Sequence, residues 1–147
     1  MTMISRRTAV IGSVAALGVA ACQPAATILS VTASASANAN PGPGGGGRPL
    51  TLTVVQMSGT GAFDSSDFFA LQDPTTALGA EFIGVTQLVL PPGGSAATSF
   101  EVRPGAAAIG FIAGYRDPSG KVFRRRIPAP SSSAAVSVSV TASGVSV

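Results

Sequence analysis

From residue 26 onward, apolar and small polar residues alternate one by one through several segments of the chain. The alternation is clearest at residues 29–33, 50–54 and 136–140, and residues 109–115 carry apolar side chains at every second position. Successive side chains of a β-strand point to opposite faces, so an alternating segment buries one face and leaves the other in water. The chain after residue 25 is therefore expected to be all-β, with two sheets packed face to face.

Turn sequences separate these segments. Clusters of proline, glycine and aspartate lie at residues 91–94, 104–105, 117–120 and 128–130, and such clusters are typical of tight turns. Their spacing predicts seven or eight short strands, as in a β-sandwich. The core residues predicted from the alternation are Leu29, Val31, Leu52, Val54, Val89, Phe100, Ile109, Phe111, Phe123 and Val138.

Residues 63–71 break the alternation and favour a helix. Asp64 has the position of an N-cap, and Asp67 falls near the positive end of the helix. Phe63 and Phe68 have the spacing of a hydrophobic staple.

The end of this helix is also marked. Asp73 precedes a proline, and a residue before proline avoids the helical region, so the helix is expected to close there. A second helical turn is expected over residues 75–78, ending at Gly79. We expect a short helical insertion after the second strand, packed on the sandwich by Phe68, Phe69 and Leu71.

The first 21 residues resemble an export signal. Arg6 and Arg7 precede an uncharged apolar run over residues 8–20, which is short for a membrane span but fits the core of a signal peptide. The run ends in Val19-Ala20-Ala21-Cys22, which is similar to the lipobox of bacterial lipoproteins. We expect residues 1–21 to be a lipoprotein signal peptide, residues 22–25 a lipidated tether and residues 26–147 a β-sandwich domain.

The lipobox implies a location. Cys22 would carry covalent lipid, and two or more acyl chains hold a protein stably on a membrane. Gln23 follows, whereas lipoproteins kept in the inner membrane mainly have aspartate there, so the implied location is the periplasmic face of the outer membrane. A secretory signal followed by an incidental free cysteine is the alternative, and either the general or the twin-arginine export route fits Arg6 and Arg7.

The composition excludes several classes of site. The chain has no histidine and one cysteine, which excludes imidazole catalysis, His-ligated zinc and a disulfide framework. From Cys22 onward, seven basic and six acidic residues leave a charge of only +1, which does not favour nucleic acid as a partner. Neither a phosphate-binding loop nor a nucleophile motif is present. An enzyme is therefore not expected, and neither a metal nor a cofactor other than the lipid.

Four features in order resemble the type VI secretion lipoproteins of the TssJ family, also called SciN or VasD. They are the lipobox, the strand end Gln56-Met57, the Asp-Phe-Phe segment within residues 63–71, and the strand end Ala113-Gly114-Tyr115-Arg116-Asp117. The resemblance covers most of residues 26–130. The chain departs from the family at Phe123-Arg124, where the family usually has Trp-Arg.

The resemblance implies a transthyretin-like β-sandwich that docks the periplasmic C-terminal domain of a TssM-type inner-membrane protein and, through it, TssL. In the family, the loop between the first two strands contacts the partner. The matching loop here spans about residues 35–49, and the partner-binding residues implied are Asn38, Asn40, Pro41, Pro43 and Arg48. The four consecutive glycines of this loop are also typical of a flexible linker, and that alternative stays open.

Three other segments contain charged residues that a binding site could use. Residues 124–126, all arginine, form either a basic patch or a solvated sheet edge that deters strand pairing, with at most two side chains on one face. Asp64, Asp67 and Asp73 lack the ligand spacing of a calcium loop, and capping explains the first two more simply. Residues 115–117 predict a strand end with a local Arg–Asp pair.

For the whole protein, a periplasmic lipoprotein that binds a small ligand or glycan is the alternative function.

Overall fold

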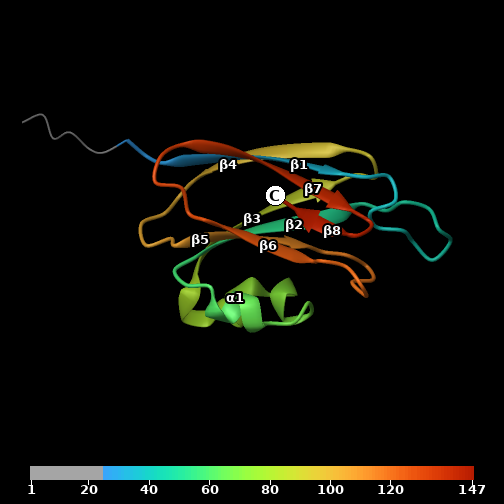
Figure 1. Cartoon of the computed structure of the whole chain (residues 1–147), viewed down its shortest axis with the longest axis horizontal. Helices are drawn as coiled ribbons and strands as arrows, with labels where there is room; N and C mark the ends of the chain where they lie inside the picture. Colours follow the sequence, from blue (N-terminus) through green and yellow to red (C-terminus); the bar gives the residue numbers. More distant parts are fainter. Residues whose placement is uncertain (1–24) are drawn as a thin grey trace, which may run out of the picture.

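The computed structural model of the protein describes residues 25–147. The predicted signal peptide, the lipid site at Cys22 and residues 23–24 of the predicted tether lie outside this range. Within it, eight strands form two sheets, and short helices follow the second strand (Figure 1). This confirms the predicted all-β sandwich with its helical insertion. The elements are β1 (Ile28–Ala35), β2 (Leu50–Met57), α1 (Gly61–Ser65), η1 (Ala70–Gln72), α2 (Pro74–Leu78), η2 (Gly79–Glu81), β3 (Phe82–Leu90), β4 (Ser95–Glu101), β5 (Ala108–Ala113), β6 (Arg124–Pro128), β7 (Ala134–Thr141) and β8 (Gly144–Ser146).

Each sheet contains four strands. One sheet has the order β4-β1-β7-β8 and the other has the order β3-β2-β5-β6. All neighbouring strands are antiparallel except β1 and β7, which are parallel and place Val31 opposite Val136. The Ser/Val/Ala-rich C-terminal segment therefore forms regular strands inside the sandwich.

The main core lies between the two sheets, where the alternation predicts it. The predicted core residues that are fully buried are Leu29, Val31, Leu52, Val54, Ile109, Phe111 and Val138. Phe100 and Phe123 are partly buried against them. The prediction for Val89 is wrong: it is 62% exposed, and Leu88 and Leu90 point inward instead. Because residues 88–90 are all apolar, the sequence does not show which parity faces the core, and the pairing with β2 decides it.

The helical insertion covers the outer face of the second sheet (Figure 1). A second cluster joins Val55, Met57, Ala108 and Ile112 of the sheet to Phe63, Leu71 and Leu78 of the insertion. The Phe63 ring lies directly over Gly110, where a Cβ atom would come within 2.6 Å of the ring. As a result, every residue of β5 is buried, on both faces of the sheet.

The predicted single helix is wrong in its bounds and its cap. Helix α1 ends at Ser65, Thr60 stands at its N-cap, and Asp64 lies inside the helix. A longer helix would need the carbonyl oxygens of Phe63 and Asp64 as acceptors, and the Arg124 guanidinium donates to both of them at 2.9 and 2.7 Å. A tertiary contact thus satisfies the carbonyl oxygens at the point where the helix ends, earlier than the local sequence predicts.

The aromatic residues of the insertion lie in different surroundings. Phe63 and Phe68 belong to different clusters, so the predicted staple is not formed. Phe68 packs edge-on against Phe123, with ring centroids 5.3 Å apart. Phe69 was expected to pack on the sandwich, but its side chain is 77% exposed.

Two aspartates accept hydrogen bonds at other turns of the insertion. Asp67 accepts at 2.7 Å from the amide of Ala70, the first residue of the 3-10 turn η1, although Phe69 holds the N-cap position. Asp73 was expected to end a helix, and instead it begins α2, accepting from both the amide and the hydroxyl of Thr76. The predicted turn near residues 75–78 is present as α2, and Gly79 ends it with a φ of 55°, a conformation that glycine adopts readily.

Candidate partner-binding site

The loop between β1 and β2, residues 36–49, lies at the end of the sandwich opposite the first described residue, Ala25 (Figure 1). Strand β1 runs from one end to the other, and its eight residues span about 26 Å at ~3.3 Å per residue. We call the end that carries the 36–49 loop the distal end. A surface there faces away from the point where the chain enters the fold.

The glycine run of this loop forms a hairpin. Pro41 and Gly47 are bridged, the Gly42 amide donates to the Gly46 carbonyl at 2.7 Å, and the Gly45 amide donates to the Gly42 carbonyl at 3.0 Å. Gly45 has a φ of 83°, which residues with a side chain rarely adopt. The composition is typical of a linker, whereas the chain here has hairpin hydrogen bonds of its own.

Asn40 connects this hairpin to the sandwich. Its side chain is only 6% exposed; Nδ2 donates to the Pro49 carbonyl at 3.0 Å, and Oδ1 accepts from the Arg116 amide at 2.8 Å. The Asn40 carbonyl accepts from the Arg48 amide at 2.9 Å. Next to it, Ala39 is buried in the core. These contacts determine the direction in which the hairpin leaves the sandwich.

The structure divides the five implied partner-binding residues into two groups. Asn38, Pro41, Pro43 and Arg48 are exposed. Asn40 is buried, and both Nδ2 and Oδ1 form hydrogen bonds inside the fold, so it positions the loop instead of presenting a contact surface. Binding by the other four stays a prediction.

Sequence reasoning did not place Arg116 in this site. It is exposed, and it lies beside the loop because its backbone amide binds Asn40, 76 residues earlier. The only signal in the sequence was the Tyr-Arg-Asp motif itself, which contains no information about Asn40.

Tyr115 holds the strand end next to Arg116. Its hydroxyl donates to the Thr141 carbonyl at 2.7 Å, and the Lys121 ammonium lies 5.0 Å from its ring centroid. Burial raises the pKa of the Tyr115 hydroxyl to about 12, because the charged phenolate would lose its hydration. Tyr115 is therefore a neutral hydrogen-bond donor at physiological pH.

The predicted pair between Arg116 and Asp117 is wrong. Asp117 Oδ1 accepts from the Ser119 amide at 3.1 Å, and this hydrogen bond is the main reason that the pKa of Asp117 is lowered. Within residues 25–147, the ion pair that forms is Arg126 with Asp64. The Arg116 guanidinium thus has no carboxylate partner in the described part of the chain.

A hollow of about 370 Å³ lies on the hairpin. It is lined by Arg48 and by the four glycines Gly42, Gly44, Gly46 and Gly47. The Arg48 side chain crosses Gly42, where an added Cβ atom would collide with its Nε. Glycines therefore leave room for the guanidinium and expose backbone around it.

The three consecutive arginines at residues 124–126 lie on β6, which is an edge strand as predicted. Arg124 and Arg126 face the insertion: Arg124 binds its carbonyl oxygens, and Arg126 forms a bidentate pair with Asp64 at 2.9 and 3.0 Å. Arg125 points the other way. The alternation of strand side chains is confirmed, but two of the three arginines hold the insertion in place.

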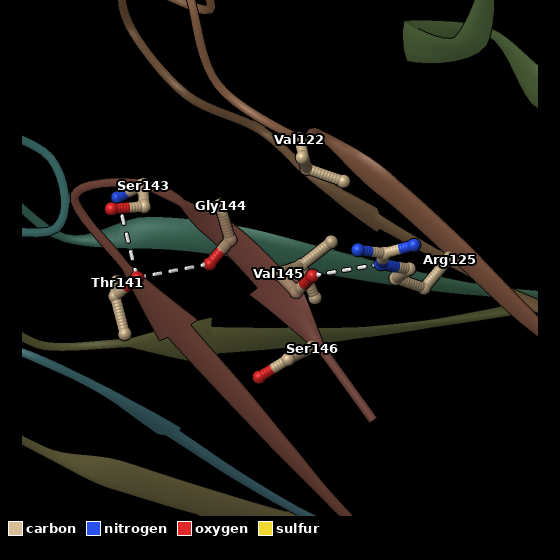
Figure 2. Close-up of a pocket in the computed structure, with 7 residues that line it drawn as sticks. All are labelled: Val122, Arg125, Thr141, Ser143, Gly144, Val145 and Ser146. Carbon is tan, nitrogen blue, oxygen red and sulfur yellow. Dashed lines mark hydrogen bonds between the residues drawn. The ribbon is translucent and has the colours of Figure 1, made fainter.

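A second hollow, of about 190 Å³, lies at the seam between β8 and the start of β6 (Figure 2). Arg125 Nε donates to the Val145 carbonyl at 3.4 Å there, and the Val145 amide donates to Val122 at 2.8 Å. These contacts join the two sheets along one side.

Two negative findings apply to residues 25–147. No helix there is long and apolar enough to cross a membrane. No group of three or more Asp, Glu or Cys side chains there could hold a metal ion.

The sequence profile of one protein family, described as "Type VI secretion lipoprotein, VasD, EvfM, TssJ, VC_A0113", matches residues 27–143. A comparison with curated protein sequences gives no significant match.

Solved structures with a similar fold come from the same secretion system. The lipoprotein TssJ1 of Pseudomonas aeruginosa is 23% identical with a TM-score of 0.75, over 83% of this chain and 95% of that one. Serratia marcescens Lip, a membrane-bound component of the type VI secretion system, is 24% identical with a TM-score of 0.76, over 82% and 96%. A chain from a structure described as "T6SS protein TssM C-terminal domain (869-1107) from EAEC" is 19% identical with a TM-score of 0.66, over 81% and 95%.

The structural similarity to these chains establishes the fold. The family's sequence profile, which spans most of the sandwich, establishes the family. The lipobox-like start of the sequence, the insertion after β2 and the motif residues at the ends of β2 and β5 agree with it. The chain belongs to the TssJ family of type VI secretion lipoproteins.

Proposed function

We propose that this chain is the outer-membrane lipoprotein of a type VI secretion membrane complex, and that its distal end docks the periplasmic domain of a TssM-type inner-membrane protein. In this function the chain is a structural component without catalytic activity. TssL would be reached indirectly, through the TssM-type protein. The observation that carries the proposal is the ordered 36–49 loop, with its exposed Arg48, at the end of the sandwich opposite Ala25.

The geometry supports a docking function. If Cys22 carries the lipid, the six residues to Ile28 can hold the sandwich no more than about 20 Å from the membrane, at ~3.3–3.6 Å per residue. Strand β1 then carries the 36–49 loop about 26 Å farther into the periplasm. That position can be reached by a domain that extends from the inner membrane.

One structural relative supports the identity of the partner. A chain of similar fold comes from a structure that is described as a TssM C-terminal domain of the type VI secretion system. This match supports a TssM-type protein as the partner.

Docking is tested with the full mature chain in detergent, by biolayer interferometry against the periplasmic domain of the TssM-type protein of the same system. The matched variant deletes residues 42–46 and joins Pro41 to Gly47. These two residues are bridged, so their Cα atoms lie about 5 Å apart and the join strains the loop little. Asn40 and Arg48 remain.

Saturable binding by the wild-type chain that is weakened in the deletion variant would support both the function and the loop assignment. Equal binding by the two chains would exclude residues 42–46 from the interface, and Arg48, which both chains keep, would remain a candidate contact. No binding by the folded wild-type chain would contradict the docking function, and the search would then turn to small ligands and glycans.

The lipid anchor is tested separately. Cys22→Ser should remove the protein from the outer-membrane fraction, because the acyl chains supply the affinity for that membrane. Persistent outer-membrane location of this variant would contradict lipidation at Cys22.

A further inference from the structure

The buried Asn40 holds the backbones of two exposed arginines that come from different loops. Its carbonyl accepts from the Arg48 amide at 2.9 Å, and its side-chain Oδ1 accepts from the Arg116 amide at 2.8 Å. Arg48 precedes β2, and Arg116 follows β5. One residue therefore holds the backbones of both arginines at the distal end.

Both side chains are free to bind a partner. Arg48 and Arg116 are exposed, and in the part of the chain that the structure describes neither pairs with a carboxylate. The nearest acid in sequence, Asp117, accepts from the Ser119 amide, and the charge of Arg116 lowers the pKa of Asp117 less than this hydrogen bond does. Each guanidinium keeps five N–H donors, in a geometry that matches a carboxylate.

The surroundings of Arg48 allow a close approach. Four glycines line the hollow beside it, and its side chain lies across Gly42. Because these four positions are glycine, an acidic residue of a partner and its flanking backbone can reach the guanidinium from the side of the hollow.

Charge is distributed unevenly along the long axis of the sandwich. The loops of the distal end carry Arg48, Arg116 and Lys121 against the single acid Asp117. The opposite end carries Glu81, Glu101 and Arg103. The loops of the distal end thus carry a positive charge, although the described domain as a whole is nearly neutral, and the acids of the neighbouring insertion, Asp67 and Asp73, lie outside these loops.

We infer that Arg48 and Arg116 form a paired recognition site for carboxylates on an acidic segment of the docking protein. The inference rests on the docking function proposed above and adds the chemistry of the partner: an Asp/Glu-bearing segment that meets the glycine hairpin and the end of β5 together. Arginine is enriched among the residues that dominate binding energy at interfaces. Complementary charge also speeds the encounter of the two proteins.

The test compares full mature chains in detergent that carry Arg48→Gln, Arg116→Gln and both changes, in the binding assay described above, over a series of NaCl concentrations. Arg125→Gln is the matched control, because it removes the same charge from an exposed side chain on the β6 edge. Both test substitutions leave the backbone hydrogen bonds to Asn40 intact, and thermal unfolding of each variant confirms that it is folded.

We expect each single change at Arg48 or Arg116 to weaken binding about tenfold or more, and the double variant to lose most of the salt dependence that the wild-type chain shows. Arg125→Gln should bind within about twofold of wild type. Arg48→Lys should recover only part of the affinity, since lysine keeps the charge but not the bidentate geometry.

Two outcomes would overturn the inference, and they differ in what they leave standing. Wild-type binding that the double variant retains at unchanged salt dependence would remove the two-arginine site and keep the docking function. An absence of binding by the wild-type chain would remove both.

Discussion

The backbone amide of Arg116 donates to Oδ1 of Asn40 at 2.8 Å, across 76 residues of sequence. This contact joins the loop before β2 to the end of β5, and it makes the distal end of the sandwich a single surface. The Nδ2 atom of the same Asn40 side chain donates to the Pro49 carbonyl.

Asn40→Ala should therefore lower the free energy of unfolding by about 1–3 kcal/mol, because it leaves the Arg116 amide and the Pro49 carbonyl without their partner. Urea denaturation measures the change. The control is Asn38→Ala: Asn38 is exposed, and the Ser36 hydroxyl that donates to it can bind water instead, so the cost should stay within about 0.5 kcal/mol. Equal losses in the two variants would contradict a special role for Asn40.

Adjacent phenylalanines of the insertion should differ sharply in their contribution to stability. Phe68 is 8% exposed and packs on Phe123, so Phe68→Ala should cost about 3–5 kcal/mol. Phe69 is 77% exposed and touches Phe68 only edge-on, so Phe69→Ala should cost less than about 1 kcal/mol. Thermal or urea unfolding of the two variants is the measurement, and a reversed order would show that the insertion is packed differently.

Arg124 should matter more to the insertion than Arg126 does. Arg124 donates to the carbonyl oxygens of Phe63, Asp64 and Ser66 from a partly buried position, so Arg124→Ala should cost about 1.5–3 kcal/mol. Amides of α1 should also exchange faster with deuterium in this variant.

Arg126→Gln is the comparison for Arg124→Ala. Its ion pair with Asp64 is on the surface, with side chains 44% and 47% exposed, so the loss should be smaller and should disappear at high salt. A larger, salt-independent loss for Arg126→Gln would contradict this ranking.

The titration of Tyr115 is predicted to couple to folding at high pH. It is the only tyrosine of the chain, so absorbance at 295 nm follows it without interference. Burial raises its pKa from about 10 in the unfolded chain to about 12 in the folded one. Because the pKa of Tyr115 is higher in the folded chain, the free energy of unfolding keeps its full value below pH 10 and falls as the pH rises from 10 through 12.

Tyr115→Phe supplies the control for this titration. It should remove the part of the stability that changes between pH 10 and 12, and it should also lose the hydrogen bond to the Thr141 carbonyl at all lower pH values. A tyrosine midpoint near 10 in the folded wild-type chain would contradict the burial effect.

Much of the sandwich could be predicted from alternation, because strands with one buried face record that burial at every second residue. Residues 29–33 and 50–54 show this, and their inward faces are buried as expected. Val89 was misplaced because its neighbours Leu88 and Leu90 are apolar too, so the parity of this segment depends on its register with β2. Strand β5 is buried on both faces only because the insertion covers the outer one.

The insertion shows the opposite case. Capping and staple patterns within residues 63–71 predict one helix, yet Arg124 of the edge strand takes the carbonyl oxygens that such a helix would use. No local pattern contains this information, because the residues in contact are about 60 positions apart in the chain.

The candidate site could be predicted only in part. The resemblance to the family indicated the 36–49 loop, and four of its five implied residues are exposed. It did not show that Asn40 is buried or that Arg116 lies next to the loop.

By itself, then, the sequence determined the fold class and the place of the helical insertion after β2, since both depend on residue types and short spacings, whereas the contact loop was implied by the resemblance to the family. Only the tertiary structure decided the register of β3, the residue at which α1 ends, and the hydrogen bonds by which Asn40 holds the backbones of Arg48 and Arg116. These depend on hydrogen bonds and packing between distant segments, whose energies exist only after the two sheets have come together.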